Sequence, residues 1–200
     1  MIYGAMLAGG SGTRVKSSKI PKQFIEIGGK PIIIYTLENM LKVKRFDYIY
    51  IAVHKDYEDY MNEQVKKNIP ESEKVRVILG GKERMDTINN VTTAITNDNG
   101  IHDDDVIVIH DAVRPFVTEK ILNDSIDCAA EYGACVCGLP CADTIPIQRE
   151  ESMLKTSLSE ASFTADKLPT ASALPTLSKC RITSLRSRKK SSQALRRYAQ

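Results

Sequence analysis

Residues 2–24, IYGAMLAGGSGTRVKSSKIPKQF, join an apolar run to a glycine-rich and strongly basic stretch. The run at residues 2–8 has the composition of a buried strand, and three glycines follow it within four positions: Gly9, Gly10 and Gly12. Small residues there let successive backbone N–H groups converge on the oxygens of an anion. Arg14 can contact a phosphate in bidentate fashion, and Lys22 can do so as a point charge. The stretch therefore predicts a strand that ends in a loop shaped for a polyanion.

The alternation of apolar strands with segments of helical periodicity continues to residue 140. Further strands are predicted at residues 48–53, 74–81, 105–117 and 133–140. Helices are predicted at residues 31–42, 57–67 and 85–96, and Thr118 is placed to cap another. Strands separated by helices of about a dozen residues have right-handed crossovers and form a parallel, doubly wound α/β sheet. Ligands of such sheets bind at the carboxyl ends of the strands.

Three loops leave these strand ends, at residues 9–22, 80–87 and 110–116. The first loop lacks the lysine and hydroxyl residue of a P-loop, and it lacks the third glycine of a dinucleotide fingerprint. Taken alone, it fits a glycine turn followed by solvated cations as well as it fits an anion site. In the second, Asp86 or Thr87 is also a candidate helix cap. The third places Asp111 directly after a buried strand, where a carboxylate suits Mg²⁺ shared with substrate phosphates. A cap, or an ion pair with Arg114, is the structural alternative for Asp111.

Composition restricts the class of protein. At 200 residues, with 42% hydrophobic and 26% charged residues, the chain has the size and balance of one globular domain. No run approaches the roughly 18 apolar residues of a membrane helix, and the N-terminus lacks a signal-peptide layout. The five cysteines have no paired metal spacing, which indicates buried thiols and the reducing cytoplasm.

Four motifs occur in order at or after these strand ends: LAGGSGTR with PKQF, GGKERMDT, HDAVRPFV and ADTI. Over residues 1–148 the chain resembles the sugar-phosphate cytidylyltransferases, the family of ribitol-5-phosphate cytidylyltransferase and 2-C-methyl-D-erythritol 4-phosphate cytidylyltransferase. The resemblance implies a Rossmann-like, doubly wound, mostly parallel sheet with a short β-arm that starts near residue 141 and reaches the partner of a homodimer. It also implies that the polyanion is the triphosphate of CTP, with Mg²⁺ as cofactor and a polyol phosphate as acceptor.

Carried over by position, the resemblance assigns roles to individual residues. Arg14 and Lys22 are the expected catalytic cations, and Asp111 is the expected metal ligand. The polyol-phosphate side is expected to comprise Arg114, Asp143 and Thr144. The residues expected to contact CTP are Leu7, Ala8, Gly9, Gly10, Ser11, Gly12, Gly80, Gly81, Lys82, Glu83, Arg84, Met85, Asp86, Thr87 and Ala112. No general base is needed, because a phosphate monoester with a second pKa of about 6 is already largely dianionic at pH 7.

The pair Gly9-Gly10, where the erythritol enzymes more often have Ala-Gly, favours the ribitol branch of the family. The predicted reaction is therefore transfer of CMP from CTP to D-ribitol 5-phosphate, which gives CDP-ribitol and pyrophosphate. The alternative acceptor is 2-C-methyl-D-erythritol 4-phosphate, as in isoprenoid biosynthesis. A further alternative is an inactive remnant that binds CTP without turnover, because the C-terminal part of the chain departs from the family.

Residues 151–200 differ from the nucleotidyltransferase domain expected at residues 1–150. No glycine follows Gly138, and residues 170–200 hold eight lysines and arginines without one acidic residue. The segment KTSLSEASFTADKLP (155–169) can be written in codons that, read one nucleotide earlier, give KDIPERSKLYRGQTP, which resembles the family's next segment. We therefore expect an out-of-frame, disordered or poorly packed tail that leaves the sheet without its late strand. The basic charge of this tail is then a by-product of the shifted reading frame. Neither nucleic acid nor a membrane is an expected partner.

Overall fold

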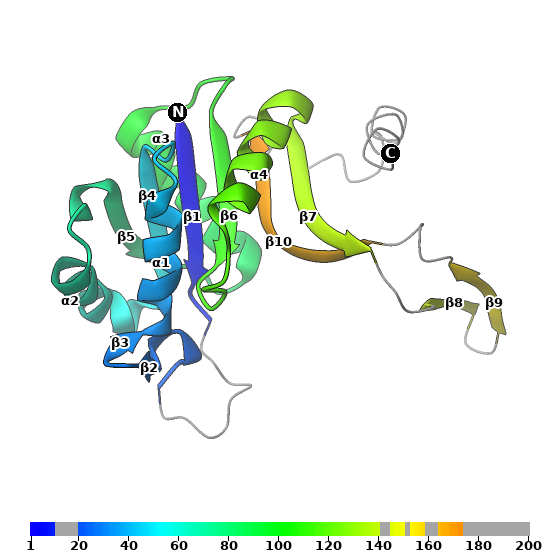
Figure 1. Ribbon diagram of the computed structural model, residues 1–200, viewed down its shortest axis with the longest axis horizontal. Coiled ribbons are helices and arrows are strands. Elements are labelled where there is room, and N and C mark those ends of the chain that lie inside the picture. Colours follow the sequence, from blue (N-terminus) through cyan, green and yellow to red (C-terminus); the bar gives the residue numbers. More distant parts are fainter. Residues whose placement is uncertain (11–19, 141–144, 151–152, 159–163, 174–200) are drawn as a thin grey trace.

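The computed structural model describes residues 1–10, 20–140, 145–150, 153–158 and 164–173. Its centre is a six-stranded sheet with the order β5-β4-β1-β6-β10-β7 (Figure 1). The strands are β1 (Ile2–Ala8), β4 (Tyr48–Val53), β5 (Val75–Leu79), β6 (Val106–Asp111), β7 (Ala134–Pro140) and β10 (Thr164–Ala173). β1 pairs in parallel with β4 and β6, and β4 pairs in parallel with β5. Only β10 runs against its neighbours β6 and β7, so the sheet is mostly parallel, as predicted.

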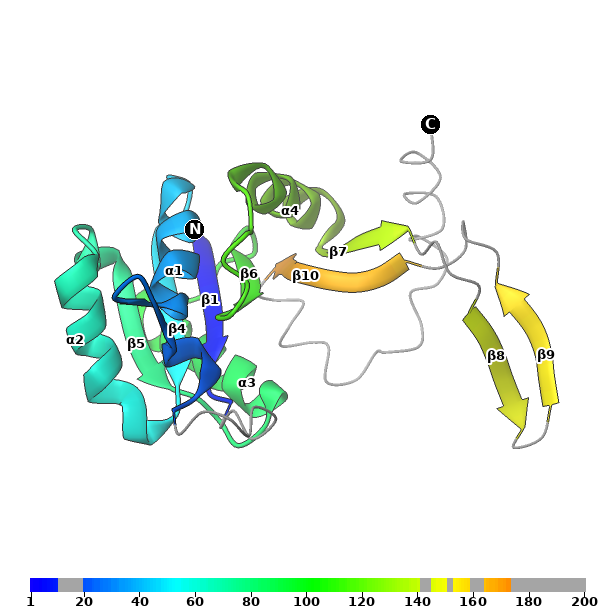
Figure 2. The same ribbon diagram turned by 60° about the horizontal axis from the view of Figure 1, so that its bottom comes forward.

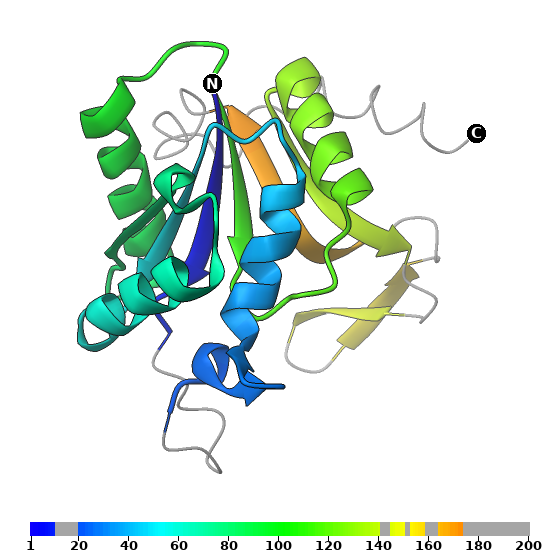
Figure 3. The same cartoon turned by 60° about the vertical axis from the view of Figure 1, so that its left-hand side comes forward.

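Helices cover both faces of the sheet, which confirms the doubly wound arrangement (Figure 3). They are α1 (Ile32–Lys42), α2 (Glu58–Asn68), α3 (Arg84–Asn99) and α4 (Glu119–Tyr132), with the 3₁₀ turns η1 (Lys22–Phe24), η2 (Lys55–Tyr57) and η3 (Ser72–Lys74). Buried side chains of α1, α2 and α4 pack on one face, and those of α3 pack on the other. Thr118 caps α4 as predicted, because its hydroxyl accepts a hydrogen bond from Ile121 N at 3.3 Å.

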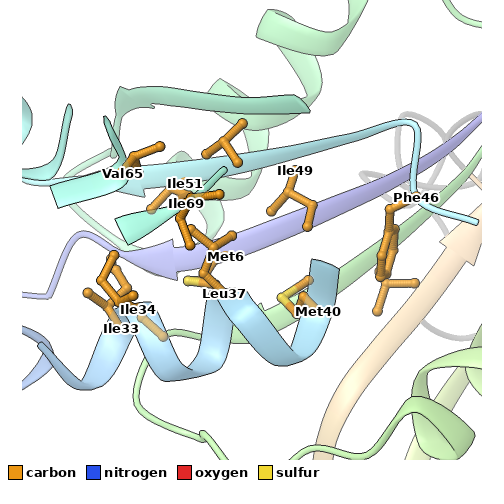
Figure 4. Packing of buried hydrophobic residues seen from close by; sticks show 14 of the residues in the cluster. Met6, Ile33, Ile34, Leu37, Met40, Phe46, Ile49, Ile51, Val65 and Ile69 are labelled. Atoms are coloured by element: carbon orange, nitrogen blue, oxygen red, sulfur yellow. The ribbon is translucent and has the colours of Figure 1, made fainter. Parts of the chain in front are cut away.

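The alternation of side chains along β1 divides the core between the two faces of the sheet. Met6 and Ala8 pack in the cluster that includes α1, whereas Tyr3 and Ala5 pack in the cluster that includes α3. Figure 4 shows Met6 beside Leu37 of α1. Burial of a large apolar side chain stabilises the folded state by about 1.5–3 kcal/mol. β1 is packed on both faces up to its last residue. None of the helices in the described ranges is long and apolar enough to cross a membrane.

Two small antiparallel hairpins accompany the sheet. β2 (Glu26–Ile27) and β3 (Lys30–Pro31) are joined by Gly28 and Gly29, whose φ values of 60° and 78° are those of a tight hairpin turn. β8 (Ile145–Glu150) pairs with β9 (Met153–Leu158), and this hairpin lies apart from the large sheet (Figure 2). It forms the short β-arm that we expected after the fifth predicted strand.

The segment expected to be a poorly packed tail contributes β9 and β10 to the fold. β10 pairs with both β6 and β7, so residues 164–173 are built into the sheet, whereas the expected loss of a strand nearer the C-terminus stays a prediction. The physical reason is that β6 and β7 each present a row of backbone N–H and C=O groups, and an incoming strand satisfies them whatever its side chains. The out-of-frame origin of residues 151–200 stays a prediction, and residues 174–200 lie outside the described ranges.

Candidate nucleotide-binding site

The three predicted loops meet where β1, β5 and β6 end. Gly9 follows β1 and Gly80 follows β5, and a Cβ built on Gly80 would lie only 3.4 Å from the Cα of Gly9. The third loop is tied to the first, because Ala112 N donates a hydrogen bond to Leu7 O at 3.2 Å. The predicted CTP-binding residues of all three loops that fall in the described ranges are therefore gathered at one end of the sheet.

The second loop is fixed by the first turn of α3. Thr87 is buried, and its hydroxyl accepts a hydrogen bond from Gly81 N and donates one to Glu83 O, both at 3.0 Å. Glu83 and Asp86 form a reciprocal capping box, in place of a cap by Asp86 or Thr87 alone. Asp86 and Thr87 therefore shape the loop. Lys82 and Met85 are exposed beside it.

Asp111 lies between two guanidinium groups. Arg84 donates from Nη1 to Oδ1 at 2.8 Å, and Arg114 donates from Nε to Oδ2 at 3.1 Å. Burial acts to raise the pKa of Asp111, but hydrogen bonds and charges from the two arginines outweigh it and hold that pKa below its usual range. Asp111 is therefore ionised at pH 7. Arg114 forms the ion pair that the sequence offered as the alternative role for this carboxylate.

The donor chemistry at Asp111 suits a magnesium ion that is held mainly by a bound triphosphate. Mg²⁺ in phosphate sites usually takes one or two protein carboxylates and completes its shell with phosphate and water oxygens. Within the described residues no group of three or more His, Cys, Asp or Glu side chains is placed to hold a metal ion. One ionised carboxylate at the end of β6 fits this requirement.

The third loop is braced by α1. Thr36 is buried and donates to Ala112 O at 2.8 Å, and Asn39 donates to Pro115 O at 2.5 Å. Sequence reasoning missed both residues, because each contact spans 76 positions and no local pattern indicates it. His110 is buried too, and burial lowers its pKa to about 4, so its imidazole is neutral at pH 7.

η1 brings Lys22 next to the first loop. Lys22 is exposed, whereas the next two residues, Gln23 and Phe24, are buried. The Gln23 amide donates from Nε2 to Ala8 O at 2.8 Å and to Gly10 O at 3.1 Å. Sequence reasoning missed Gln23, because its burial, which favours pairing of its amide, follows from tertiary packing and from no local pattern. The other predicted site residues lie outside the described ranges: Ser11, Gly12, Arg14, Asp143 and Thr144.

The sequence pattern of the family described as 2-C-methyl-D-erythritol 4-phosphate cytidylyltransferase (IspD) matches residues 2–193. The chain belongs to this family. It is therefore a nucleotidyltransferase of the cytidylyltransferase type, from a family that joins CTP to a phosphorylated sugar alcohol. The matching family is named after the erythritol acceptor, which the sequence motifs gave as the alternative. The match gives no specific support to ribitol 5-phosphate.

Solved structures share the IspD fold with this chain. The 4-diphosphocytidyl-2C-methyl-D-erythritol synthase of Anaerococcus prevotii DSM 20548 aligns with a TM-score of 0.75 at 21% identity, over 100% of this chain and 83% of that one. The 2-C-methyl-D-erythritol 4-phosphate cytidylyltransferase of Francisella tularensis aligns with a TM-score of 0.67 at 22% identity, over 99% and 86% of the two chains. At such identities the likeness establishes the Rossmann-like α/β fold alone.

Proposed function

We propose that this IspD family member transfers CMP from CTP to 2-C-methyl-D-erythritol 4-phosphate and releases pyrophosphate. The observation that carries the proposal is the family match over residues 2–193. The site supports it, because two glycine loops converge beside a carboxylate that two arginines bind. Nucleotides bind α/β proteins at such carboxyl ends of parallel strands. Backbone N–H groups of the glycine loops would hold the triphosphate.

The chemistry needs placement and charge neutralisation rather than a base. The acceptor phosphate is largely dianionic at pH 7, since its second pKa is about 6. One of its oxygens attacks the α-phosphorus of CTP in line, and the bond from that phosphorus to the bridging oxygen of the leaving pyrophosphate breaks. Negative charge then develops on the α-phosphoryl oxygens and the leaving group. Arg14 and Lys22 are the cations that stabilise it in this proposal.

Asp111 is the residue that would hold Mg²⁺, with triphosphate oxygens as the other ligands. The ion, when bound, neutralises phosphate charge in addition to the two cations. Arg114 would meet the phosphate of the acceptor, with Asp143 and Thr144 on the same side. The β8–β9 arm would reach a second subunit in a homodimer, and the cytoplasm stays the predicted compartment.

D-ribitol 5-phosphate is the second candidate acceptor, favoured by the pair Gly9-Gly10. The two are separated by incubating the purified chain with CTP, Mg²⁺ and one acceptor at a time while pyrophosphate release is followed. We expect release with methylerythritol phosphate, and its loss when EDTA removes the metal. Release with ribitol 5-phosphate alone would reassign the acceptor. Absence of release with either acceptor would refute the proposal and leave a CTP-binding remnant.

A further inference from the structure

Gln23 lies in the candidate site, but the proposed reaction gives it no role. Its side chain is 4% exposed and follows Lys22 directly. The two carbonyls to which it donates belong to Ala8, the last residue of β1, and to Gly10, two residues beyond it. We propose that Gln23 is a positioning residue that fastens the end of β1 and Gly10 to the turn at residues 22–24 and thereby sets Lys22 against the triphosphate. This role rests on the proposed cytidylyl transfer.

The two hydrogen bonds fix the orientation of the backbone after β1. A trans peptide unit directs its C=O and its N–H to opposite sides. Because Ala8 O faces the Gln23 amide at 2.8 Å, the N–H of Gly9 is turned away from Gln23. Gln23 thus decides the side on which the first glycine of the loop offers a donor to an anion.

Gln23 and Phe24 together clamp the η1 turn to the domain, and the half contributed by Phe24 is hydrophobic. Phe24 is 2% exposed, stacks on Tyr57 with ring centroids 4.7 Å apart, and meets the edge of Tyr60 at 5.3 Å. Lys22 therefore stands on a turn whose next two side chains are both locked in the interior. The backbone from which the Lys22 side chain extends is fixed in this way, which limits how far its ammonium group must be reorganised when charge develops on the phosphate.

Two substitutions separate the amide from the shape of its side chain. Gln23→Met keeps the length of the side chain and removes both donors. Gln23→Glu keeps the shape and places a carboxylate against two carbonyl oxygens. Gln64→Met is the control, because Gln64 lies on α2 and its side-chain Oε1 accepts only an intrahelical bond from Asn68 at 3.2 Å among the described contacts.

Steady-state kinetics test the effect on Lys22. Gln23→Met should lower kcat for pyrophosphate release by about 10- to 100-fold, since a shift of about 1 Å in a catalytic group costs up to that much. KM for CTP should change less, and Gln64→Met should match the wild type. Lys22→Ala should lower kcat less in the Gln23→Met background than alone, because both changes remove the same interaction, that of Lys22 with the triphosphate. Additive effects, or a normal kcat in both Gln23 variants, would overturn the proposal.

Hydrogen exchange gives a second readout that does not depend on turnover. In Gln23→Met the amides of residues 7–10 and 20–25 should exchange about five- to tenfold faster, as expected from the loss of hydrogen bonds worth about 1 kcal/mol, while the rest of the sheet is unchanged. Unchanged exchange, or a rise spread over the whole domain, would show that Gln23 does not fasten this loop. If the wild type releases no pyrophosphate, the proposed function fails, while the exchange result still decides whether the clamp exists.

Discussion

Gly81 is the position in the second loop at which an added methyl group meets the backbone. Its Cβ would lie 2.2 Å from the Cβ of Asp86 and 2.7 Å from Thr87 N. Non-bonded carbon atoms rest about 3.5–4.0 Å apart, so Gly81→Ala must separate the turn from the start of α3 by more than about 1 Å. That shift breaks the 3.0 Å bond from Gly81 N to Thr87 Oγ1 and the capping box of Glu83 and Asp86.

We therefore expect Gly81→Ala to lower both stability and catalytic efficiency. Loss of these hydrogen bonds, at about 0.5–1.5 kcal/mol each, should decrease the free energy of unfolding by about 2–4 kcal/mol. Because this loop is proposed to hold the triphosphate, its displacement by about 1 Å should decrease kcat/KM for CTP by up to about 100-fold.

Urea unfolding and pyrophosphate release measure the two effects. Gly10→Ala is the control for folding, because no atom of the described residues lies within 4 Å of a Cβ built there, and its free energy of unfolding should equal that of the wild type. A Gly81→Ala variant with the stability and kcat/KM of the wild type would refute this description of the turn.

Lys22→Ala should lower kcat by about 100- to 1,000-fold with a much smaller change in KM for CTP, and a rise in KM alone would make Lys22 a binding residue. Thr36→Val should decrease the free energy of unfolding in urea by about 1–3 kcal/mol by leaving Ala112 O unpaired, whereas Thr96→Val, at an exposed position of α3, should change it little. Burial lowers the pKa of His110 to about 4 in the folded state, against 6.5 when unfolded, so the unfolded state binds the proton first as pH falls. Stability should be complete above pH 6.5 and fall by about 3 kcal/mol toward pH 4; parallel pH profiles for the wild type and His110→Gln would contradict this.

The strands could be predicted where apolar runs are continuous. β1, β4 and β6 lie in the parallel centre of the sheet with both faces covered, so their sequences are apolar at nearly every position. The clustering of the glycine and charged loops also follows from sequence, because the carboxyl ends of parallel strands share one edge of a sheet.

The contacts inside the site could not be predicted, because they depend on how distant segments pack. Gln23 reaches a carbonyl 15 positions away, and Arg84 meets Asp111 across 27 positions. No local pattern selects such pairs. β10 was hidden for a related reason, since TADKLPTASA lacks regular apolar alternation and its place is set by the open edges of β6 and β7.

Direct competition between the two acceptors is the sharpest measurement of what this chain does. The 200-residue protein is given CTP, Mg²⁺ and equal concentrations of 2-C-methyl-D-erythritol 4-phosphate and D-ribitol 5-phosphate, and the products are separated by liquid chromatography and mass spectrometry. In such a mixture the product ratio reports the ratio of the two kcat/KM values. We predict pyrophosphate in equal amount to a CDP-methylerythritol product, with little CDP-ribitol. Predominant CDP-ribitol, or no CDP-linked product, would contradict the proposed cytidylyl transfer to methylerythritol phosphate.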